Sequence, residues 1–435
     1  MSSPIISKKM LIIILFAIFS QIGYSLLAPL YPFLAEERGV SSSLVGIIFS
    51  SFAISNFLLT ILTPFLSEKC GRKNLLILAI LTESSCTIWF GLITFIENQK
   101  TFIILSFIIR FCQGGGGAIV QTLIYSLTAA ISNDKEIEKN LGYIEVGTSI
   151  GIAVGPLIAS LGYYMFGFNF PFLISGFMEM LLISLVPILQ IHQCESDDDN
   201  EEHKVEILPI LTNRNIILTF LAVTMDSISL SFIYPVFASH LNKKFNLEPE
   251  QTALFFIITT IFYFLSLQIL SPANKFFGNR ITMTIGMFFN SFFILFLGPS
   301  NFLPQRLSII IIGLAGLGFG GAFISIPAVI DAIEILKNEV GLNENSAQDY
   351  ASATYNLGYF LGETVGPLFG GHLTQELGFV KACNINCAGN YCYMIVYACF
   401  IAFDKVFKRK ECKELKDFGE EKIKNIDEAE LEQLI

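Results

Sequence analysis

The chain has 435 residues, of which 53% are hydrophobic and only 15% are charged, and its mean hydropathy is +0.62. A soluble protein of this length needs more charge to cover its surface, so the composition excludes an ordinary soluble globular protein. The 42 Phe and the single Trp also suit a surface that faces lipid. The sequence therefore predicts an integral membrane protein.

The net charge of −10 is concentrated in two polar segments, residues 194–204 (CESDDDNEEHK) and the tail after Asp404. Runs of charge like these are typically solvated. We therefore interpret them as a linker and a tail, and not as binding surfaces.

Twelve apolar segments are long enough, at about 20 residues each, to cross a membrane as helices. They cover roughly residues 10–33, 43–66, 75–96, 102–131, 142–163, 170–191, 215–238, 252–271, 282–299, 305–331, 350–373 and 384–403. The first has no small-residue cleavage site, so we interpret it as a retained signal anchor and not as a secretory signal peptide.

An even number of spans places both termini on one side of the membrane. The positive-inside rule predicts that this side is the cytosol, because basic residues flank the spans there. These residues are Lys8 and Lys9, Lys69, Arg72 and Lys73, Lys275 and Arg280, and Lys405, Lys408, Arg409 and Lys410.

The chain contains an internal repeat. Gly151-Ile-Ala-Val-Gly-Pro-Leu-Ile-Ala-Ser160 returns about 210 residues later as Gly362-Glu-Thr-Val-Gly-Pro-Leu-Phe-Gly-Gly371. Shorter matches accompany it: Leu30-Tyr-Pro-Phe with Ile233-Tyr-Pro-Val, Gly71-Arg-Lys with Gly278-Asn-Arg, and Gly114-Gly-Gly-Gly-Ala with Gly318-Phe-Gly-Gly-Ala. A membrane protein made of parallel repeats typically binds its substrate where the repeats meet.

We therefore expect an all-α membrane protein built of two parallel six-helix halves. Residues 1–193 would form the N-terminal half and 215–404 the C-terminal half. Residues 194–214 would be an acidic cytosolic linker and 405–435 a cytosolic tail.

Three motifs resemble those of the major facilitator superfamily. Residues 64–73 resemble its motif between spans 2 and 3, with Pro64 and Glu68 where Gly and Asp are usual. Residues 110–118 resemble its span-4 motif, an Arg followed by Gln-Gly. The span-5 motif of proton-coupled antiporters is matched by Gly142, Gly151, Gly155 and Pro156, although it ends here in Ala-Ser and not Gly-Gly.

Within that superfamily the chain is most similar to the vesicular amine transporters, particularly the polyamine branch, and to the drug:proton antiporters. Tyr143-Ile-Glu-Val-Gly-Thr148 and Tyr355-Asn-Leu-Gly-Tyr-Phe-Leu-Gly362 carry this resemblance. It implies proton-coupled antiport of small organic cations. Monoamine and acetylcholine carriers have an Asp in spans 1 and 11, where this chain has Ser20 and Asn356, so the resemblance does not favour a monoamine substrate.

Four ionisable residues within the spans are candidates for binding substrate or protons: Asp226, Glu363, Glu145 and Arg110. A charge near the middle of a bilayer costs about 2.5–3.5 kcal/mol on insertion scales, so such residues are functional candidates. A carboxylate in a low dielectric binds a proton more readily, whereas a nearby cation favours its charged form, so the two ligands compete. Glu83 and Glu179 also lie within spans, but the resemblance places their spans, 3 and 6, outside the cavity.

Two readings of Arg110 stay open: proton coupling, as the resemblance implies, or an ion pair that only fixes helix packing. No His lies in the middle of a span, so carboxylates are the expected proton carriers. The histidines are His192, His203, His240 and His372. Neutral side chains expected to contact the substrate are Gln21, Tyr24, Tyr234 and Tyr355, with Gln121 and Tyr125 as further candidates.

Two sets of residues are expected to act in conformational change. Gly151, Gly155 and Pro156, and their repeats Gly362, Gly366 and Pro367, would let helices pack closely or bend during alternating access; tight packing alone is the alternative. In the loop after span 2, Glu68, Lys69, Arg72 and Lys73 would form ion pairs that stabilise the outward-facing state, or would only set topology, and Gly71 would permit the turn.

The remaining features are weaker. Glu430, Leu434 and Ile435 resemble an acidic dileucine sorting signal read by adaptors, with a frayed amphipathic tail as the alternative. A disulfide among Cys383, Cys387 and Cys392 is left open. No metal or cofactor site is predicted, no phosphate-binding loop is visible, and no nucleophile–base constellation indicates an enzyme. No nucleic acid partner is expected.

The sequence thus predicts a secondary transporter of the major facilitator fold that exchanges small organic cations, such as polyamines, for protons. It would lie in an intracellular vesicle, endolysosomal or plasma membrane. The alternatives are a broad-specificity drug or metabolite antiporter, a non-transporting sensor of the same fold, and a channel.

Overall fold

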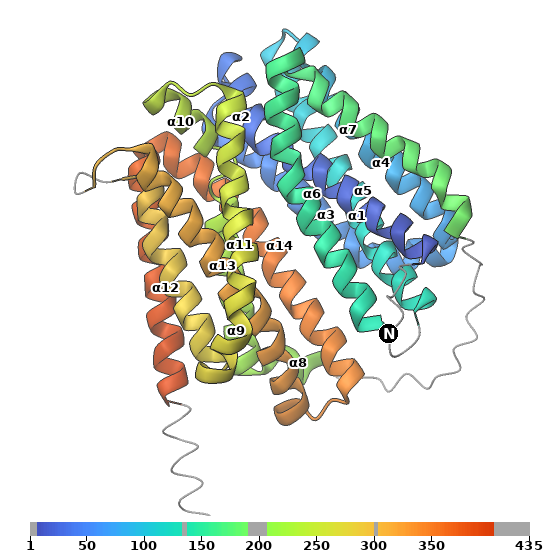
Figure 1. Ribbon diagram of the computed structural model, residues 1–435, viewed down its shortest axis with the longest axis vertical. Coiled ribbons are helices and arrows are strands. Elements are labelled where there is room, and N and C mark those ends of the chain that lie inside the picture. The colour runs from blue at the N-terminus through green and yellow to red at the C-terminus, as the bar shows by residue number, and fades with distance from the viewer. Residues whose placement is uncertain (1–6, 133–136, 190–206, 300–302, 404–435) are drawn as a thin grey trace, which may run out of the picture.

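The computed structural model describes residues 7–132, 137–189, 207–299 and 303–403, and these form helices joined by short turns (Figure 1). The N-terminal half contains α1 (Lys8–Ser25), α2 (Leu27–Glu37), α3 (Ser42–Cys70), α4 (Arg72–Leu92), α5 (Gln99–Ile131), α6 (Ile137–Phe166) and α7 (Asn169–Leu181). Short 3-10 segments, Ile93–Phe95 and Leu182–Leu189, extend α4 and α7.

The C-terminal half follows the same plan. It contains α8 (Ile207–Thr212), α9 (Arg214–Ser231), α10 (Phe237–Phe245), α11 (Pro249–Phe277), α12 (Asn279–Leu297), α13 (Leu307–Ile335), α14 (Glu344–Leu377) and a last helix, Phe379–Phe403. A π-helical turn, Leu336–Val340, continues α13. The predicted all-α architecture of two helical halves is confirmed (Figure 1).

The repeat is visible in the turns. Gly71 ends α3 with a φ of +76°, and Gly278 ends α11 with a φ of +79°. Only glycine adopts this conformation without strain, so both halves use the same residue for the same turn. The first span of each half also breaks into two helices near its Tyr-Pro motif, as α1 with α2 and as α9 with α10.

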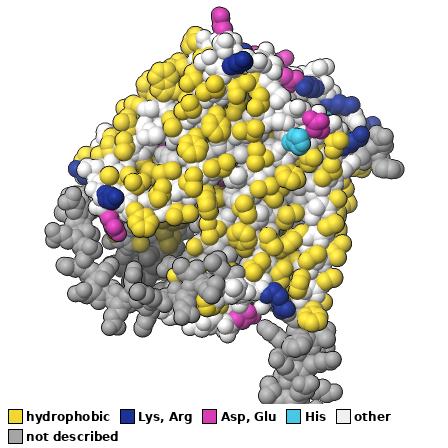
Figure 2. Space-filling model, turned by 180° about the vertical axis from the view of Figure 1, so that it is seen from behind, with side chains coloured by type: hydrophobic (Ala, Val, Ile, Leu, Met, Phe, Trp, Pro, Cys, Tyr) yellow, Lys and Arg dark blue, Asp and Glu magenta, His cyan; other side chains and the backbone are white. Residues whose placement is uncertain are grey.

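Ten of the described helices are long and apolar enough to cross a membrane, as judged by length and composition. The other two spans of the predicted twelve, formed by α9 with α10 and by α14, are less apolar because they carry buried polar residues, among them Asp226 and Glu363. On the face in Figure 2, hydrophobic side chains form a broad band, and charged side chains lie mainly towards its ends. The chain is therefore a multi-pass membrane protein.

The two halves touch mainly through α3 against α14 and α6 against α11. At the first of these contacts a side chain on Gly46 would collide with the carbonyl of Pro367, and one on Gly371 would collide with the carbonyl of Ser42. Both helices thus need glycine to approach so closely.

Candidate substrate cavity

A cavity of about 310 Å³ lies between the two halves. Its described lining comes mainly from α1, α3, α5 and α6 on one side and from α9, α11, α13 and α14 on the other. The helices α4, α7, α12 and Phe379–Phe403 contribute no lining residue within the described chain. The volume is at the lower end of the range for small-molecule sites.

The cavity brings together every residue that the sequence suggested for substrate or proton binding. The lining includes Arg110, Asp226, Glu145, Glu363, Gln21, Tyr24, Tyr234 and Tyr355. These residues come from both halves and are separated by up to 342 positions along the chain (Gln21 to Glu363), so only the fold explains their proximity.

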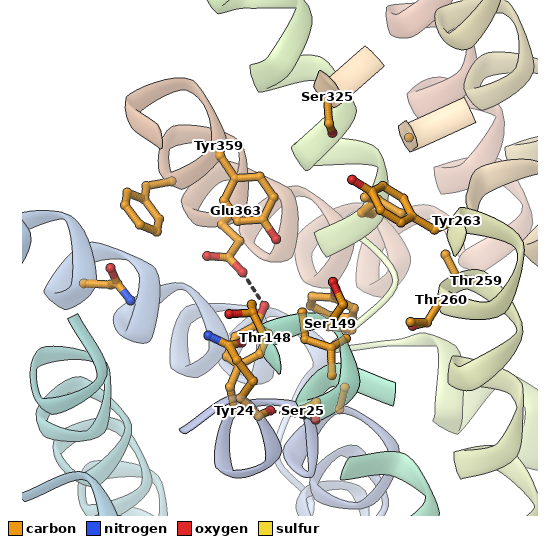
Figure 3. A pocket seen from close by; sticks show the side chains of 18 of the residues that line it. Tyr24, Ser25, Thr148, Ser149, Thr259, Thr260, Tyr263, Ser325, Tyr359 and Glu363 are labelled. Atoms are coloured by element: carbon orange, nitrogen blue, oxygen red, sulfur yellow. Dashed lines mark hydrogen bonds between the residues drawn. The ribbon is translucent and has the colours of Figure 1, made fainter. Parts of the chain in front are cut away.

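Glu363 lies on α14 and is 6% exposed. Its carboxylate accepts a hydrogen bond from the hydroxyl of Tyr24 on α1, in the opposite half (Figure 3). The ring of Tyr234 meets the ring of Tyr24 edge-on, with centroids 6.4 Å apart. One carboxylate therefore connects the two halves across the cavity.

Asp226 lies on α9 and is 3% exposed. It accepts a hydrogen bond from the side-chain amide of Asn290 on α12. The hydroxyl of Ser325 on α13 is also within hydrogen-bonding reach. This carboxylate thus has only neutral donors as hydrogen-bond partners among the described residues, so its charge, when present, can attract a cation.

Arg110 is 1% exposed and donates from Nη1 to Oε1 of Gln113 at 2.7 Å. Its guanidinium lies 4.2 Å from the ring centroid of Phe52 and 5.4 Å from that of Tyr24. It forms no ion pair with any described residue, although its charge interacts with Glu363 and with Glu83. Aromatic faces stabilise a buried cation of this kind. The alternative interpretation of Arg110, an ion pair that only fixes helix packing, finds no such pair among the described residues.

Glu145 occupies a different position from the other two carboxylates. It is exposed on α6 and accepts a hydrogen bond from the hydroxyl of Tyr125 on α5. It therefore lies where the cavity meets solvent, while Asp226 and Glu363 lie inside.

Other lining residues were missed by sequence reasoning. Tyr359 lies on α14 beside Glu363, and Tyr263 with Thr259 and Thr260 lies on α11 (Figure 3). Ser325 comes within reach of both Tyr263 and Tyr355. A single Tyr, Thr or Ser in an apolar span does not reveal whether it faces the cavity or the lipid. These residues can therefore be identified only once the orientation of each helix is known.

The helices α2 and α10 lie at the end away from the N-terminus (Figure 1), and contacts between the two halves close the cavity there. There, Lys243 forms an ion pair with Glu36 at 2.6 Å, and the amide of Ser43 donates to Oε1 of Gln375 at 3.3 Å. Slightly deeper, the hydroxyl of Ser50 donates to the carbonyl of Thr364 at 2.7 Å. All of these contacts join one half to the other at the end that we predict to be non-cytosolic.

The repeated glycines are packing positions in both halves. A side chain on Gly151 would come 2.7 Å from Cβ of Gln21, and one on Gly362 would come 2.5 Å from Cβ of Ser227. Side chains on Gly155 and Gly366 would likewise collide with Ser25 and Ser231. The α6–α1 contact in one half is thus equivalent to the α14–α9 contact in the other. Pro156 of α6 also lines the cavity.

The four charged residues lie at the end of α3 and the start of α4, on either side of the turn at Gly71. Glu68, Lys69 and Lys73 are exposed and Arg72 is half-buried, and none of them forms an ion pair with a described residue in this conformation. Their role in the opposite conformation stays a prediction. In the other half, Arg280 pairs with Asp331 at 2.9 Å, and Thr219 donates to the same carboxylate at 3.0 Å.

Cys383, Cys387 and Cys392 are free thiols on the last helix, the first two buried and the third exposed. The sorting motif at Glu430, Leu434 and Ile435 lies outside the described residues, as does the acidic segment 194–204.

Comparison with known proteins decides the family. The family model described as the Major Facilitator Superfamily matches the chain twice, over residues 13–224 and 216–426. The chain belongs to the Major Facilitator Superfamily. The double match follows the internal repeat, and the chain is a transporter and not an enzyme.

Two curated relatives indicate the group. The human MFS-type transporter SLC18B1 is 26% identical over 384 residues, covering 84% of this chain and 80% of that protein. Multidrug resistance protein 2 of Bacillus subtilis is 26% identical over 267 residues, covering 58% of this chain and 64% of that protein. The predicted similarity to the vesicular amine and drug antiporter group is confirmed.

Solved structures confirm the fold. The nucleoside transporter NupG superposes with a TM-score of 0.72 at 11% identity, covering 91% of this chain and 99% of that one. An inward-facing, unoccupied bacterial homolog of the human lysosomal transporter Spinster gives a TM-score of 0.71 at 12% identity, covering 92% and 97%.

Proposed function

We propose that this chain is a proton-coupled antiporter of small organic cations, with amines or polyamines as the substrate class. The observation that carries the proposal is the position of Glu363. It is buried between the halves, bonded to Tyr24 of the opposite half, and accompanied in the same cavity by Asp226.

The chemistry follows from competition for these carboxylates. An ammonium group that enters the cavity would replace the Tyr24 hydroxyl at Glu363 and would be flanked by the aromatic rings of Tyr24 and Tyr234. Its positive charge favours the ionised carboxylate, so a bound proton leaves. When a proton returns, the attraction for the ammonium is lost and the substrate is released.

Alternating access would couple binding at Glu363 to the movement of the substrate across the membrane. The Tyr24–Glu363 hydrogen bond and the contacts around Ser50 and Thr364 hold the halves together on one side of the cavity. Because Tyr24 belongs to one half and Glu363 to the other, occupancy of Glu363 by a proton or a cation would alter a contact that must break when the halves rock.

The orientation is part of the proposal. We infer that the termini and the linker lie in the cytosol, so the cavity would face inward here. We also propose residues 1–193 and 215–404 as the two moving bodies. An endolysosomal, vesicular or plasma membrane location would suit this activity, and a tail signal at Glu430, Leu434 and Ile435 would direct the choice among them.

The test uses the full chain in proteoliposomes with an acidic interior and a panel of spermidine, serotonin and acetylcholine. We expect uptake of one amine class that requires the gradient and is lost in Glu363→Gln. Glu376→Gln, an exposed residue of the same helix α14, is the matched control and should transport normally. Absence of gradient-dependent flux with every amine, in folded protein, would overturn the proposal.

A broad-specificity drug antiporter is the second candidate. The similarity to a protein named for multidrug resistance supports it, and so does the aromatic lining by Phe52, Phe256, Tyr263 and Phe360. Competition separates the two: a selective carrier shows saturable inhibition by one class of amine, whereas a broad one is inhibited by unrelated lipophilic cations.

A further inference from the structure

Two carboxylic acids lie in the N-terminal half away from the cavity lining. Glu83 of α4 is 1% exposed and Glu179 of α7 is 3% exposed. Both sit within apolar spans, where a single charge is already costly. Two adjacent negative charges add their repulsion to that cost, so such a pair is stable only when something neutralises at least one of them.

The hydrogen bonds of this pair are incomplete. Ser20 of α1 donates to Oε1 of Glu83 at 2.7 Å. Oε2 of Glu83 and both carboxylate oxygens of Glu179 have no donor among the described residues. The two carboxyl groups nevertheless lie within hydrogen-bonding reach of each other. An ionised carboxylate only accepts, so a proton on either one creates a donor and satisfies two of these three oxygens.

Within the described chain, one cation is available to the pair. Arg110 interacts electrostatically with Glu83, whereas the only charged group among the described residues that acts on Glu179 is Glu83 itself. Arg110 also interacts with Glu363 in the cavity. The single positive charge of Arg110 is therefore shared between Glu83 and the cavity carboxylate Glu363. It can balance at most one charge of the Glu83–Glu179 pair, so the other carboxyl group of the pair needs a proton.

The surroundings leave room for these carboxyl groups. A side chain on Gly117 of α5 would come 3.1 Å from Oε1 of Glu83, and one on Gly23 of α1 would come 3.8 Å from Oε2 of Glu179. A side chain on Gly116 would come 2.9 Å from the backbone nitrogen of Glu83. Gly116 and Gly117 of the glycine run in α5 thus border Glu83, whereas Gly114 and Gly115 pack against α3.

Ser20 connects the pair to the cavity, since it lines the cavity and also donates to Glu83. We propose that Glu83 and Glu179 form a second proton-binding site that holds one shared proton and exchanges it with the cavity through Ser20. On uptake, the Ser20 oxygen accepts a proton from the cavity while its own hydroxyl proton moves to Oε1 of Glu83. The serine is restored, and the pair gains one proton.

The use of this proton in transport rests on the proposed function, but the site itself can be tested without a substrate. Infrared difference spectra between alkaline and acidic buffer, recorded on the full chain in lipid vesicles, report the carbonyl stretch of protonated carboxyl groups. We expect one such band to disappear in Glu179→Gln, because the glutamine amide donates to Glu83 and keeps it ionised. The double variant Glu83→Gln/Glu179→Gln, which buries no charge and retains a hydrogen-bonded pair, should fold and also lack the band.

Glu97→Gln, at an exposed residue just after α4, is the control and should keep the band. Ser20→Ala should keep it too while slowing its appearance after a pH jump. A band that is unchanged in both Glu179→Gln and the double variant would overturn the proposal.

Transport separates this proposal from the one before it. With spermidine as the probe, Glu179→Gln should still exchange but move about half as many protons per spermidine as the unsubstituted chain. If the unsubstituted chain moves no protons with spermidine, the proposed function fails while the infrared result still decides the pair. If Glu179→Gln moves as many protons per spermidine as the unsubstituted chain, the pair has no part in coupling and the inference fails.

Discussion

The two halves share one fold but place their buried acids differently. When the two halves are aligned at Gly71 and Gly278, Glu83 of α4 occupies the position equivalent to Asn290 of α12. In the N-terminal half the acid is on the outer helix and bonds the neutral Ser20 on α1. In the C-terminal half the neutral Asn290 is on the outer helix and bonds the acid Asp226 on α9.

The same interhelical contact can therefore carry its acid on either of the two helices. Where the acid lies on the inner helix, as Asp226 does, it faces the cavity and a substrate can reach it. Where it lies on the outer helix, as Glu83 does, it is not part of the described cavity lining and contacts it through residues such as Ser20. The repeat thus preserves helix packing, while the acid is placed on a different helix in each half.

The largest expected effect belongs to the carboxylate that joins the halves. Glu363→Gln removes the charge that attracts a cation and weakens the bond to Tyr24. A hydrogen bond to a charged group is worth about 1.5–3 kcal/mol, so we expect cation affinity to fall about 10- to 100-fold. Equilibrium binding of spermidine measures this. An affinity equal to that of the Glu376→Gln control would contradict the assignment.

The exchange Asp226→Asn with Asn290→Asp imitates the N-terminal half by moving the acid to the outer helix. We expect Asp226→Asn alone to weaken spermidine binding about tenfold, since one attractive charge in a low dielectric is lost. The double exchange should keep the interhelical hydrogen bond and the thermal stability but leave binding weak. Recovery of full affinity in the double variant would show that the position of the acid is unimportant.

Packing at the repeated glycines should be equally sensitive in both halves. A side chain on Gly362 or Gly151 enters occupied space, so Gly362→Val and Gly151→Val should each destabilise by about 1–3 kcal/mol. Thermal unfolding in detergent measures the loss. Gly142→Ala, with nothing within 4 Å of the added carbon, is the control. Loss of stability in only one half would break the equivalence.

The packing of α10 on the last helix should respond to acid through His240, which lies on α10 beyond the predicted span. Its ring stacks on Phe379 at 4.1 Å, and burial, with Lys244 and Lys243 nearby, lowers the pKa of His240 from 6.5 to about 4. A lowered pKa means that α10 packed on Phe379 binds fewer protons than an arrangement that exposes the ring. This packing is therefore fully favoured above pH 6.5 and weakens as the pH falls towards 4.

Distances between spin labels on α10 and on the last helix measure this change, and His240→Gln should remove its dependence on pH across that window. A pH response that survives the substitution would place the sensor elsewhere.

The smallest effect is expected at the surface contact between the halves. Lys243 and Glu36 pair at 2.6 Å with side chains that are 64% and 43% exposed. Exposed pairs contribute about 0–1 kcal/mol, so Glu36→Gln should shift the unfolding temperature little, and less at high salt. A shift as large as that of Gly362→Val would mean that the pair holds the closed end together.

Much of this arrangement follows from the sequence. Apolar lengths predict the spans, the glycine–proline repeat predicts two equivalent halves, and the cost of buried charge singles out Asp226 and Glu363. These inferences succeed because each depends on a local property of the chain. The sequence did not predict the break between α9 and α10 or the low hydropathy of α14. Polar residues inside a span lower its hydropathy, and their position in a cavity between helices is visible only in the structure.

The partners of these acids could not be predicted. Asn290 and Ser20 are ordinary polar residues within apolar segments, and only the helix rotation shows that each faces an acid. The expectation that span 3 lies outside the cavity agrees with the described lining, which lacks Glu83, but it does not reveal the contact of Glu83 with Ser20. A sequence gives the type of a residue and its position along a span, whereas a hydrogen bond depends on the relative position and rotation of two helices.

In the proposed exchange, a carboxylate in the cavity holds either a proton or a cation. Counting the protons released when spermidine binds to the purified protein in weakly buffered solution tests this directly. We expect release that saturates together with binding and is greatly reduced in Glu363→Gln. Spermidine binding with no release of protons from the unsubstituted chain would contradict it.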